Sequence, residues 1–324
     1  MAVLVTGGAG YIGSHVVRLL INKEIEVIVL DNLSRGHKAS LPQNVIFEEV
    51  DLLDREKLSA VIQKHNIDSV IHFAAFAYVG ESVENPEMYY RNNVSGSFNL
   101  INALKEKGVR HFVFSSTCSL YGNPLHIPIS EEETTKPINP YAKTKLMIEQ
   151  ILADYDSAYG MKHVALRYFN AAGASVGGEI GESHFPEPHL IPLVLFTALD
   201  KRESISVYGD DYPTPDGTCI RDYIHVEDLA EAHVKALEYL NKGNSSQIIN
   251  LGTGDGNSVK EVISVAEEVT GRKIKSVIAP RREGDPAVLV ADNKKAKEIL
   301  GWNPEFKLKD ILQTAWQWHQ NPKY

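Results

Sequence analysis

Tyr141 and Lys145 are four positions apart in a segment whose pattern indicates a helix, so both side chains are expected on one helix face. An isolated phenol ionises near pH ~10 and is a poor base at neutral pH. A lysine ammonium beside it favours the phenolate and lowers that pKa. The same spacing also arises by chance on solvent-exposed helices. The pair therefore predicts acid–base chemistry only where other residues support it.

Two nearby features give that support. Pro140 precedes Tyr141, and proline is favoured in the first turn of a helix because its missing N–H costs nothing there. Upstream, Phe114-Ser115-Ser116-Thr117 closes a run that indicates a strand, and Thr117 is suited to hold a substrate hydroxyl beside the phenol. We expect Tyr141, Lys145 and Thr117 to form one catalytic group.

A glycine-rich loop separates the first apolar run from the first helical segment. Gly8, Gly10 and Gly13 match the pattern G-x-G-x-x-G, and Gly7 matches a wider variant of it. Such glycines allow a tight turn and let a dinucleotide pyrophosphate approach N–H groups at a helix N-terminus. A purely structural turn is the alternative, which the strand–loop–helix context disfavours. The expected cofactor contacts in this loop are Gly7, Gly10, Tyr11, Ile12 and Gly13.

Asp31 ends the second apolar run, eighteen residues after Gly13. A carboxylate there would accept hydrogen bonds from the adenosine ribose and repel a 2′-phosphate, which favours NAD over NADP. The cationic Arg35 nearby weakens that preference for NAD.

Asp51 and Leu52 follow the third run and are expected at the adenine, with a helix-capping role before Asp54 as the alternative. Further expected cofactor contacts in the same region are Asn32, Ser34, Arg35 and Gly36.

These motifs resemble those of the extended short-chain dehydrogenase family, and the resemblance covers nearly all of the 324 residues. Four segments are widespread in that family: residues 5–13, 73–75, 92–94 and 140–145. Three more narrow the likeness to its UDP-galactose (UDP-glucose) 4-epimerase group: Arg167-Tyr168-Phe169-Asn170, Arg221-Asp222-Tyr223-Ile224-His225-Val226 and residues 281–286.

The resemblance implies reversible C4 epimerisation of UDP-galactose and UDP-glucose through a transient 4-keto sugar, with tightly held NAD, as in galactose metabolism. It makes Tyr141 the base, Thr117 its hydroxyl partner and Lys145 the residue that tunes the pKa and contacts ribose. It adds as cofactor contacts Phe73, Ala74, Ala75, Ala77, Asn92, Tyr141, Lys145 and Phe169. It gives as UDP-sugar contacts Thr117, Tyr141, Tyr168, Phe169, Asn170, His189, Leu190, Ser206, Tyr208, Arg221, Arg282, Asp285 and Leu289.

Two positions depart from the family pattern. Many members have lysine where this chain has Ala77, and asparagine where it has His189, which puts one cofactor contact and one substrate contact in doubt.

Arg221 and Arg282 would supply the cations that a diphosphate needs, although a surface ion pair is the alternative for either. The resemblance also implies that Leu289 limits the sugar pocket. Its intermediate size predicts secondary activity on UDP-N-acetylhexosamines, with strict specificity as the alternative.

Several other functions are weighed against this one. A dehydratase needs an acid–base pair after Thr117, where this chain has Cys118 and Ser119. His184, Glu187 and His189 lie among prolines without helical spacing, so we expect ordinary surface histidines and no metal. Cys118 is expected to pack rather than react. A non-catalytic NAD-binding sensor, an ordinary dehydrogenase and another sugar-nucleotide-modifying enzyme of the family remain alternatives.

The elements that must position these residues alternate between apolar runs and helical segments. The expected strands are residues 2–5, 26–30, 44–47, 69–73 and 111–114, and the expected helices 13–23, 54–66, 88–107, 141–159, 258–270 and 309–319. Buried Val- and Ile-rich runs separated by helices are typical of a doubly wound parallel sheet, the α/β Rossmann class. Ligands then bind at the carboxyl ends of the strands.

After Asn170 glycine and proline become frequent. We therefore expect an NAD-binding domain over residues 1–170 and a smaller, loop-rich UDP-sugar-binding domain over 171–324. Part of roughly 222–252 is expected to return to the first domain. Helices 88–107 and 141–159 carry apolar residues on more than one face, which predicts a homodimer formed by a four-helix bundle, with deeper burial inside one subunit as the alternative.

Composition restricts the partners. The formal net charge is −9, which argues against nucleic acid and anionic membrane surfaces. No apolar stretch is long enough to span a membrane, and no secretory signal is recognised. The chain has 2 cysteines, too few for a disulfide framework, and a reduced, cytoplasmic location is expected.

Overall fold

The computed structural model describes residues 2–282 and 284–324. Met1 and Glu283, the latter within the 281–286 motif, lie outside the described residues. The chain forms two compact units. The first comprises Met1–Leu120, Thr135–Arg167 and Ala230–Ile249, and the second comprises Tyr121–Thr134, Tyr168–Leu229 and Asn250–Tyr324. This division differs from a single boundary near residue 170, because residues 121–134 group with the second unit. The expected domain limits stay a prediction.

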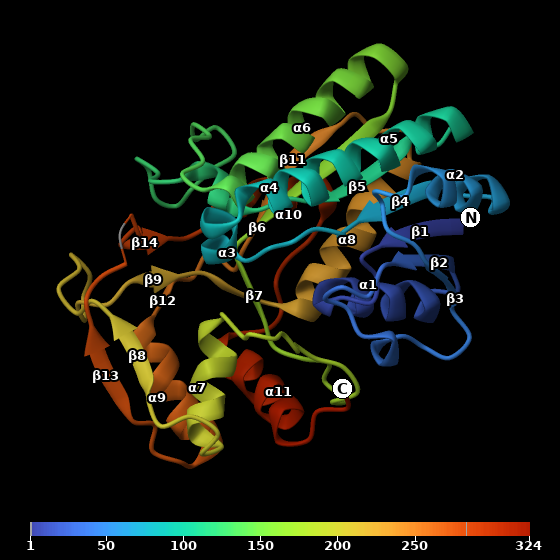
Figure 1. The fold of residues 1–324 in the computed structure, drawn as a ribbon. Helices are drawn as coiled ribbons and strands as arrows, with labels where there is room; N and C mark the ends of the chain where they lie inside the picture. Colours follow the sequence, from blue (N-terminus) through green and yellow to red (C-terminus); the bar gives the residue numbers. More distant parts are fainter. Residues whose placement is uncertain (1, 283) are drawn as a thin grey trace. The chain divides into compact units, whose positions relative to one another are not determined.

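A seven-stranded sheet organises the first unit (Figure 1). Its order is β11-β6-β5-β4-β1-β2-β3, and the pairings that join β1 to β6 are parallel. The strands are β1 Ala2–Thr6, β2 Glu26–Asp31, β3 Ile46–Glu49, β4 Ser69–His72, β5 His111–Ser115, β6 Lys162–Tyr168 and β11 Gln247–Leu251. The predicted doubly wound parallel sheet is confirmed. The strand order reverses between β1 and β4, which is where such sheets bind ligands.

Helices cover both faces of this sheet. In Figure 1, α2, α5 and α6 lie side by side on one face, and α1 and α8 lie on the other. The helical segments are α1 Tyr11–Asn22, α2 Arg55–Lys64, α3 Val79–Glu84, α4 Pro86–Tyr89, η2 Tyr90–Ser95, α5 Gly96–Lys107, α6 Pro140–Tyr159 and α8 Val226–Asn241, with short η1 Lys38–Ser40 and η3 Cys118–Tyr121. Leu58, Leu100 and Ile148 pack with strand residues Leu4 and Phe112 in one buried cluster.

Two sequence expectations change in detail. The third strand begins at Ile46 rather than Asn44. The helix expected over 88–107 is three segments, because residues 90–95 form a π-helical turn. Asn93 in that turn is fully buried, and its side chain bonds both the N–H and the carbonyl of Phe76. The wider turn therefore aims an amide at backbone groups near the end of β4, as π-turns often do at functional sites.

The second unit has its own core, which the expectation of a loop-rich segment did not include. Helices α7 Leu190–Ala198, α9 Val259–Thr270 and α11 Leu308–Gln320 pack together through residues such as Leu195, Val262 and Leu312. Ser258 caps α9 in a capping box with Glu261, as its position predicted. The remaining elements are α10 Lys294–Leu300, β7 Asn170–Ala172, β8 Ile205–Tyr208, β9 Ile220–Arg221, β10 Tyr223–His225, β12 Asn257–Ser258, β13 Ser276–Ala279 and β14 Val288–Leu289.

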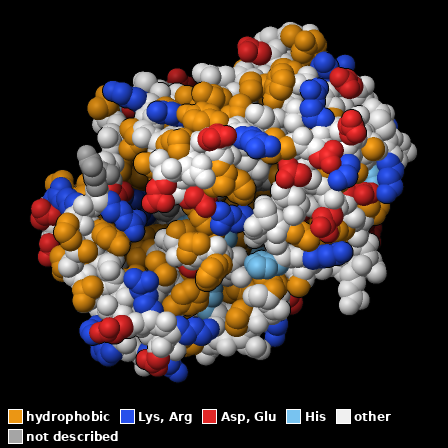
Figure 2. Space-filling view, viewed as in Figure 1, with side chains coloured by type: hydrophobic (Ala, Val, Ile, Leu, Met, Phe, Trp, Pro, Cys, Tyr) orange, Lys and Arg blue, Asp and Glu red, His pale blue; other side chains and the backbone are white. Residues whose placement is uncertain are grey.

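Small sheets connect the strands of the second unit. β7 pairs with β10, β8 with β13, and β9 lies between β12 and β14. None of the helices in the described part of the chain is long and apolar enough to cross a membrane. On the face drawn in Figure 2, the described Lys and Arg side chains are interspersed with Asp and Glu.

Candidate functional site

The glycine loop sits at the reversal of strand order, between β1 and α1. Gly7 has φ +69°, and a Cβ on it would lie 2.5 Å from the backbone N of Ala74, just after β4. A Cβ on Gly13 would lie 2.3 Å from the carbonyl oxygen of Gly7. Both positions therefore require glycine. The resulting backbone cradle, with Gly10 as the N-cap of α1, fits a dinucleotide pyrophosphate at the N–H groups of the first helical turn.

Asp31 closes β2 beside this loop. One carboxylate oxygen accepts from the N–H of Ala9 at 3.0 Å and the other from the N–H of Leu33 at 2.8 Å. Burial raises the pKa of Asp31, and these two backbone hydrogen bonds partly oppose the rise. The side chain is thus fixed by the glycine loop itself, at the position predicted to contact the adenosine ribose.

The other expected nucleotide contacts gather near Asp31. Asn32 donates to Asp51 at 3.0 Å, and Asp51 also accepts from the N–H of Leu53 at 2.8 Å. Asp54, not Asp51, caps α2 by accepting from the N–H of Lys57. Leu52 is buried in the hydrophobic core. Ser34 donates its N–H to Asn32, and a Cβ on Gly36 would lie 2.8 Å from the backbone of Ala9.

The guanidinium of Arg35 is already engaged by an acidic and an aromatic side chain. Its Nη2 lies 2.7 Å from Glu81 Oε1, and its guanidinium stacks over the ring of Tyr78 at 4.8 Å. A carboxylate that already pairs with Arg35 competes with a 2′-phosphate. This arrangement supports the predicted preference for NAD.

The three expected catalytic residues are all buried in the first unit. Tyr141 is 8%, Lys145 3% and Thr117 6% exposed. Asn139 caps α6 by accepting from the N–H of Ala142, and Pro140 occupies the first turn, so the helix begins where the sequence indicated. Lys145 Nζ lies 5.9 Å from the centre of the Tyr141 ring and donates to the carbonyl of Ser115 at 2.7 Å.

Burial lowers the pKa of Lys145 to about 7, although the nearby Glu149 carboxylate opposes the shift. A buried lysine on the same helix face as a tyrosine stabilises a phenolate by Coulomb attraction in a medium of low dielectric. Thr117 follows directly after the end of β5, and its Oγ1 accepts from the N–H of Ser119 at 3.2 Å. The arrangement is suited to acid–base chemistry at a sugar hydroxyl.

Sequence reasoning missed two residues that brace this group. Glu149 lies one turn after Lys145 on α6, is buried, and binds Ser116 and Arg167. His72 at the end of β4 contacts Thr6 and Ser97 through its two ring nitrogens. Burial and the charge of Lys145 lower the pKa of His72 to about 3, so this imidazole is neutral. The four-residue spacing of Glu149 from Lys145 could have placed Glu149 on the same helix face, and the sequence gives no comparable signal for His72.

The remaining cofactor expectations lie close to the same strand ends. Phe73, Ala74 and Ala75 follow β4, and Ala77 is exposed. Asn92 is in the π-turn and donates to Asn93 at 2.9 Å. Cys118 is buried in η3, consistent with packing.

The expected UDP-sugar contacts of the second unit form two groups. Arg221 on β9 pairs with Asp285 at 2.5 Å, and Leu289 on β14 is the strand partner of Arg221. Arg282 lies over the ring of Tyr208 at 4.1 Å. Arg221 thus forms an ion pair, which was the alternative to diphosphate binding. Its partner, Asp285, is itself an expected UDP-sugar contact. Tyr168, Phe169 and Asn170 run into β7, Ser206 is on β8, and His189 and Leu190 are the N-cap and first residue of α7.

Comparison with known proteins agrees with this geometry. The NAD dependent epimerase/dehydratase family matches residues 3–252. A UDP-glucose 4-epimerase from Halalkalibacterium halodurans is 53% identical over 321 residues, covering 99% of this chain and 96% of that protein. The chain belongs to the NAD-dependent epimerase/dehydratase family, and its cofactor is NAD.

Two solved structures extend the comparison. UDP-glucose 4-epimerase from Brucella ovis in complex with NAD is 49% identical, with a TM-score of 0.95 and 97% of each chain covered. The UDP-Glc/GlcNAc 4-epimerase from Campylobacter jejuni is 42% identical, with a TM-score of 0.88, covering 98% of this chain and 99% of that one.

Proposed function

We propose that Tyr141, Lys145 and Thr117 carry out the reversible C4 epimerisation of UDP-glucose and UDP-galactose through a transient 4-keto sugar. The chain is then an NAD-dependent isomerase that serves galactose metabolism. The observation that carries the proposal is the buried Lys145 ammonium 5.9 Å from the Tyr141 ring centre, in the same unit as the glycine cradle.

Tyr141 takes the proton from the sugar O4 and returns it at the end of the cycle. Lys145 lowers the pKa of the phenol by its charge, and Thr117 holds O4 beside it. The chemistry that NAD supplies when bound is acceptance of hydride from C4 and its return to the opposite face of the sugar. Glu149 and Arg167 hold α6, and with it Tyr141, in place.

The uridine diphosphate belongs to the second unit. Arg221 and Arg282 supply the local cations that a diphosphate requires in a chain with a net charge of −9. Asp285 orients Arg221 through their ion pair, and the tyrosine under Arg282 holds the second guanidinium. The other substrate contacts proposed from the resemblance are Tyr168, Phe169, Asn170, His189, Leu190, Ser206, Tyr208 and Leu289.

Tyr141→Phe tests the assignment. We expect turnover of UDP-galactose to fall by on the order of 10²-fold or more, because a general acid–base group is removed while bound NAD is retained. Tyr159→Phe on the same helix, where the residue is 48% exposed, is the matched control and should keep wild-type turnover. Near-normal turnover in Tyr141→Phe contradicts the assignment, and net accumulation of NADH in the wild type indicates an ordinary dehydrogenase instead.

The proposal includes a homodimer formed through α5 and α6. Ile148 and Leu152 of α6 are buried in the core, whereas Phe98 on α5 and Met147 on α6 are 44% and 39% exposed. Exposed apolar side chains on two adjacent helices suit a four-helix bundle with a second subunit. Light scattering at micromolar concentration should give the mass of a dimer, and a monomer refutes this part alone.

A cytoplasmic location is proposed from the cysteines. Neither Cys118 nor Cys219 forms a disulfide. A reduced compartment is the usual setting for such a protein. Fractionation of cells that express the chain checks the location.

Secondary activity on UDP-N-acetylhexosamines also belongs to this proposal. Leu289 is half-buried beside Arg221 in the β9–β14 pair. The similarity to the UDP-Glc/GlcNAc 4-epimerase of Campylobacter jejuni supports the wider range.

A further inference from the structure

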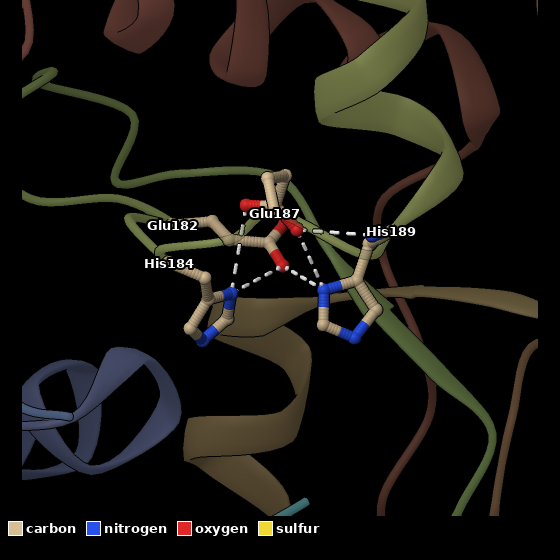
Figure 3. A group of neighbouring side chains, drawn as sticks. All are labelled: Glu182, His184, Glu187 and His189. Carbon is tan, nitrogen blue, oxygen red and sulfur yellow. Dashed lines mark hydrogen bonds and ion pairs between the residues drawn. The ribbon is translucent and has the colours of Figure 1, made fainter. Parts of the chain in front are cut away.

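Two histidines and two glutamates of the second unit converge within one loop. The loop runs from Glu182 to His189, directly before α7, and contributes all four side chains (Figure 3). His189 Nδ1 lies 2.7 Å from Glu182 Oε1 and 2.9 Å from Glu187 Oε1. His184 Nδ1 lies 3.2 Å from Glu182 Oε1 and 3.5 Å from Glu187 Oε2. The expectation of ordinary surface histidines did not include these contacts, in which both imidazoles face the same two carboxylates.

The two carboxylates in this loop are buried. The side chain of Glu182 is 3% exposed and that of Glu187 is 5% exposed. Two buried carboxylates in one place are costly unless cations compensate them. Glu182 Oε1 has no hydrogen-bond partner of acceptable geometry among the described residues, although both Nδ1 atoms lie close to it. His189, by contrast, bonds Glu187 Oε1 through both its Nδ1 and its backbone N–H, at 2.9 and 3.0 Å, so Glu182 Oε1 is the buried oxygen that an ion would satisfy.

The four ligand atoms have the chemistry and spacing of a metal site. One atom from each residue lies within 4.8 Å of the other three. Tetrahedral zinc with ligands at roughly 2.1 Å places those ligands roughly 3.4 Å apart. The imidazole–carboxylate distances here, 2.7 to 3.5 Å, are close to or below that spacing, so the side chains need to separate slightly to admit an ion. Imidazole nitrogen with carboxylate oxygen is a ligand set that zinc accepts, whereas calcium and magnesium prefer oxygen alone.

We propose that Glu182, His184, Glu187 and His189 bind one Zn²⁺ ion in a structural site that fastens this loop at the start of α7. A cavity of about 160 Å³ borders the cluster and is lined in part by Glu182, His184, Glu187, Trp318 and Tyr324. This cavity offers the ion a route from solvent, and the half-exposed His189 offers a second one.

The backbone around the cluster is already anchored. Trp318 Nε1 donates to the carbonyl of Glu182 at 2.8 Å, and a Cβ on Gly181 would lie 2.4 Å from the Trp318 ring. Because the backbone of Glu182 is already fixed against α11, binding of the ion requires little additional ordering of the loop. Zinc then links this fixed point to His189, the N-cap of α7. The role is structural and separate from the acid–base chemistry of Tyr141.

Metal content and affinity test the site directly. The full-length protein is stripped with a chelator, and Zn²⁺ alone is titrated by calorimetry, with Co²⁺ as a spectroscopic probe. We expect one ion per chain, visible Co²⁺ absorption of the tetrahedral type, and a thermal unfolding midpoint that rises with Zn²⁺ concentration. His184→Ala and Glu182→Gln should each weaken binding by at least about tenfold and remove the Co²⁺ signal.

His126→Ala is the matched control. His126 Nδ1 lies 2.9 Å from Glu133 Oε2 in the same unit, with its imidazole 84% exposed, and among the described residues this pair belongs to no group of three or more potential metal ligands. This variant should bind Zn²⁺ as the wild type does. Should Glu182→Gln fail to fold, His189→Ala at the half-exposed position replaces it, with Zn²⁺ affinity as the readout because His189 is also a proposed substrate contact. Absence of a saturable site, or equal affinity in wild type and His184→Ala, overturns the proposal and leaves the epimerase assignment untouched.

Discussion

Arg167 contacts both carboxylate oxygens of Glu149, at 3.0 Å from Nε to Oε1 and 2.5 Å from Nη2 to Oε2, with both side chains 4% exposed. Ser116 donates to the same carboxylate at 2.5 Å. Glu149 lies one turn after Lys145, and Ser116 directly precedes Thr117. This buried pair therefore fixes the helix of Tyr141 against the strand end that carries Thr117.

Breaking the pair from one side should cost more than removing both charges. Arg167→Met leaves Glu149 buried and unpaired, and we expect a loss of about 3–5 kcal/mol in the free energy of unfolding. Adding Glu149→Gln removes the stranded charge while keeping an acceptor for Ser116, so the double variant should be more stable than Arg167→Met alone. Urea unfolding measures both. A double variant that is less stable than Arg167→Met contradicts this account of the pair.

Lys145 should make stability depend on pH in the NAD-free protein. Its pKa is about 7 in the fold, lowered by burial, and ~10.4 in an unfolded chain. Below pH 7 both states carry the proton, and the folded state bears the full cost of the buried charge. Between these values the unfolded state binds more protons, so the lysine costs less stability as pH rises.

The comparison with Lys145→Met isolates that effect. The unfolding free energy of the wild type, relative to Lys145→Met, should rise by about 1 kcal/mol per pH unit between pH 7 and 9. Lys143→Met, at an exposed position on the same helix, should show no such difference. Parallel pH profiles for wild type and Lys145→Met are the result that excludes a lowered lysine pKa.

Gly7→Ala should abolish NAD retention. The added Cβ would lie 2.5 Å from the backbone N of Ala74, and φ at Gly7 is +69°, so the loop must move away from β4. Bound NAD is measured by absorbance after gel filtration. Gly80→Ala is the control, because a Cβ there meets nothing within 4 Å. Equal NAD content in Gly7→Ala and wild type argues against a pyrophosphate site in this loop.

Leu289→Tyr should narrow the substrate range. A larger side chain beside Arg221 crowds an N-acetyl group, and such steric differences are worth about 1–3 kcal/mol. The ratio of kcat/KM for UDP-N-acetylgalactosamine to that for UDP-galactose should fall roughly tenfold or more. Leu289→Met conserves volume and should leave the ratio unchanged. A wild type with no N-acetyl activity refutes the dual specificity and leaves the main reaction standing.

Local patterns were enough to predict the doubly wound parallel sheet and the NAD cofactor. The spacing of Gly7, Gly10 and Gly13 encodes a backbone conformation, and the four-residue step from Tyr141 to Lys145 encodes a shared helix face. Both depend on neighbours within one turn or one loop. Apolar runs of Val and Ile indicated the parallel strands, because such strands are buried on both faces.

Tertiary structure decided what local periodicity does not encode. Glu149 and Arg167 are on different elements, and only the packing of α6 against β6 brings their charges together in the core. The π-turn at residues 90–95 is likewise set by the buried Asn93 and its backbone partners. The convergence of Glu182, His184, Glu187 and His189 occurs in an irregular loop, where no repeat relates side-chain direction to sequence position. In such a loop the direction of each side chain depends on backbone angles and burial, which are fixed only when the second unit packs around Trp318.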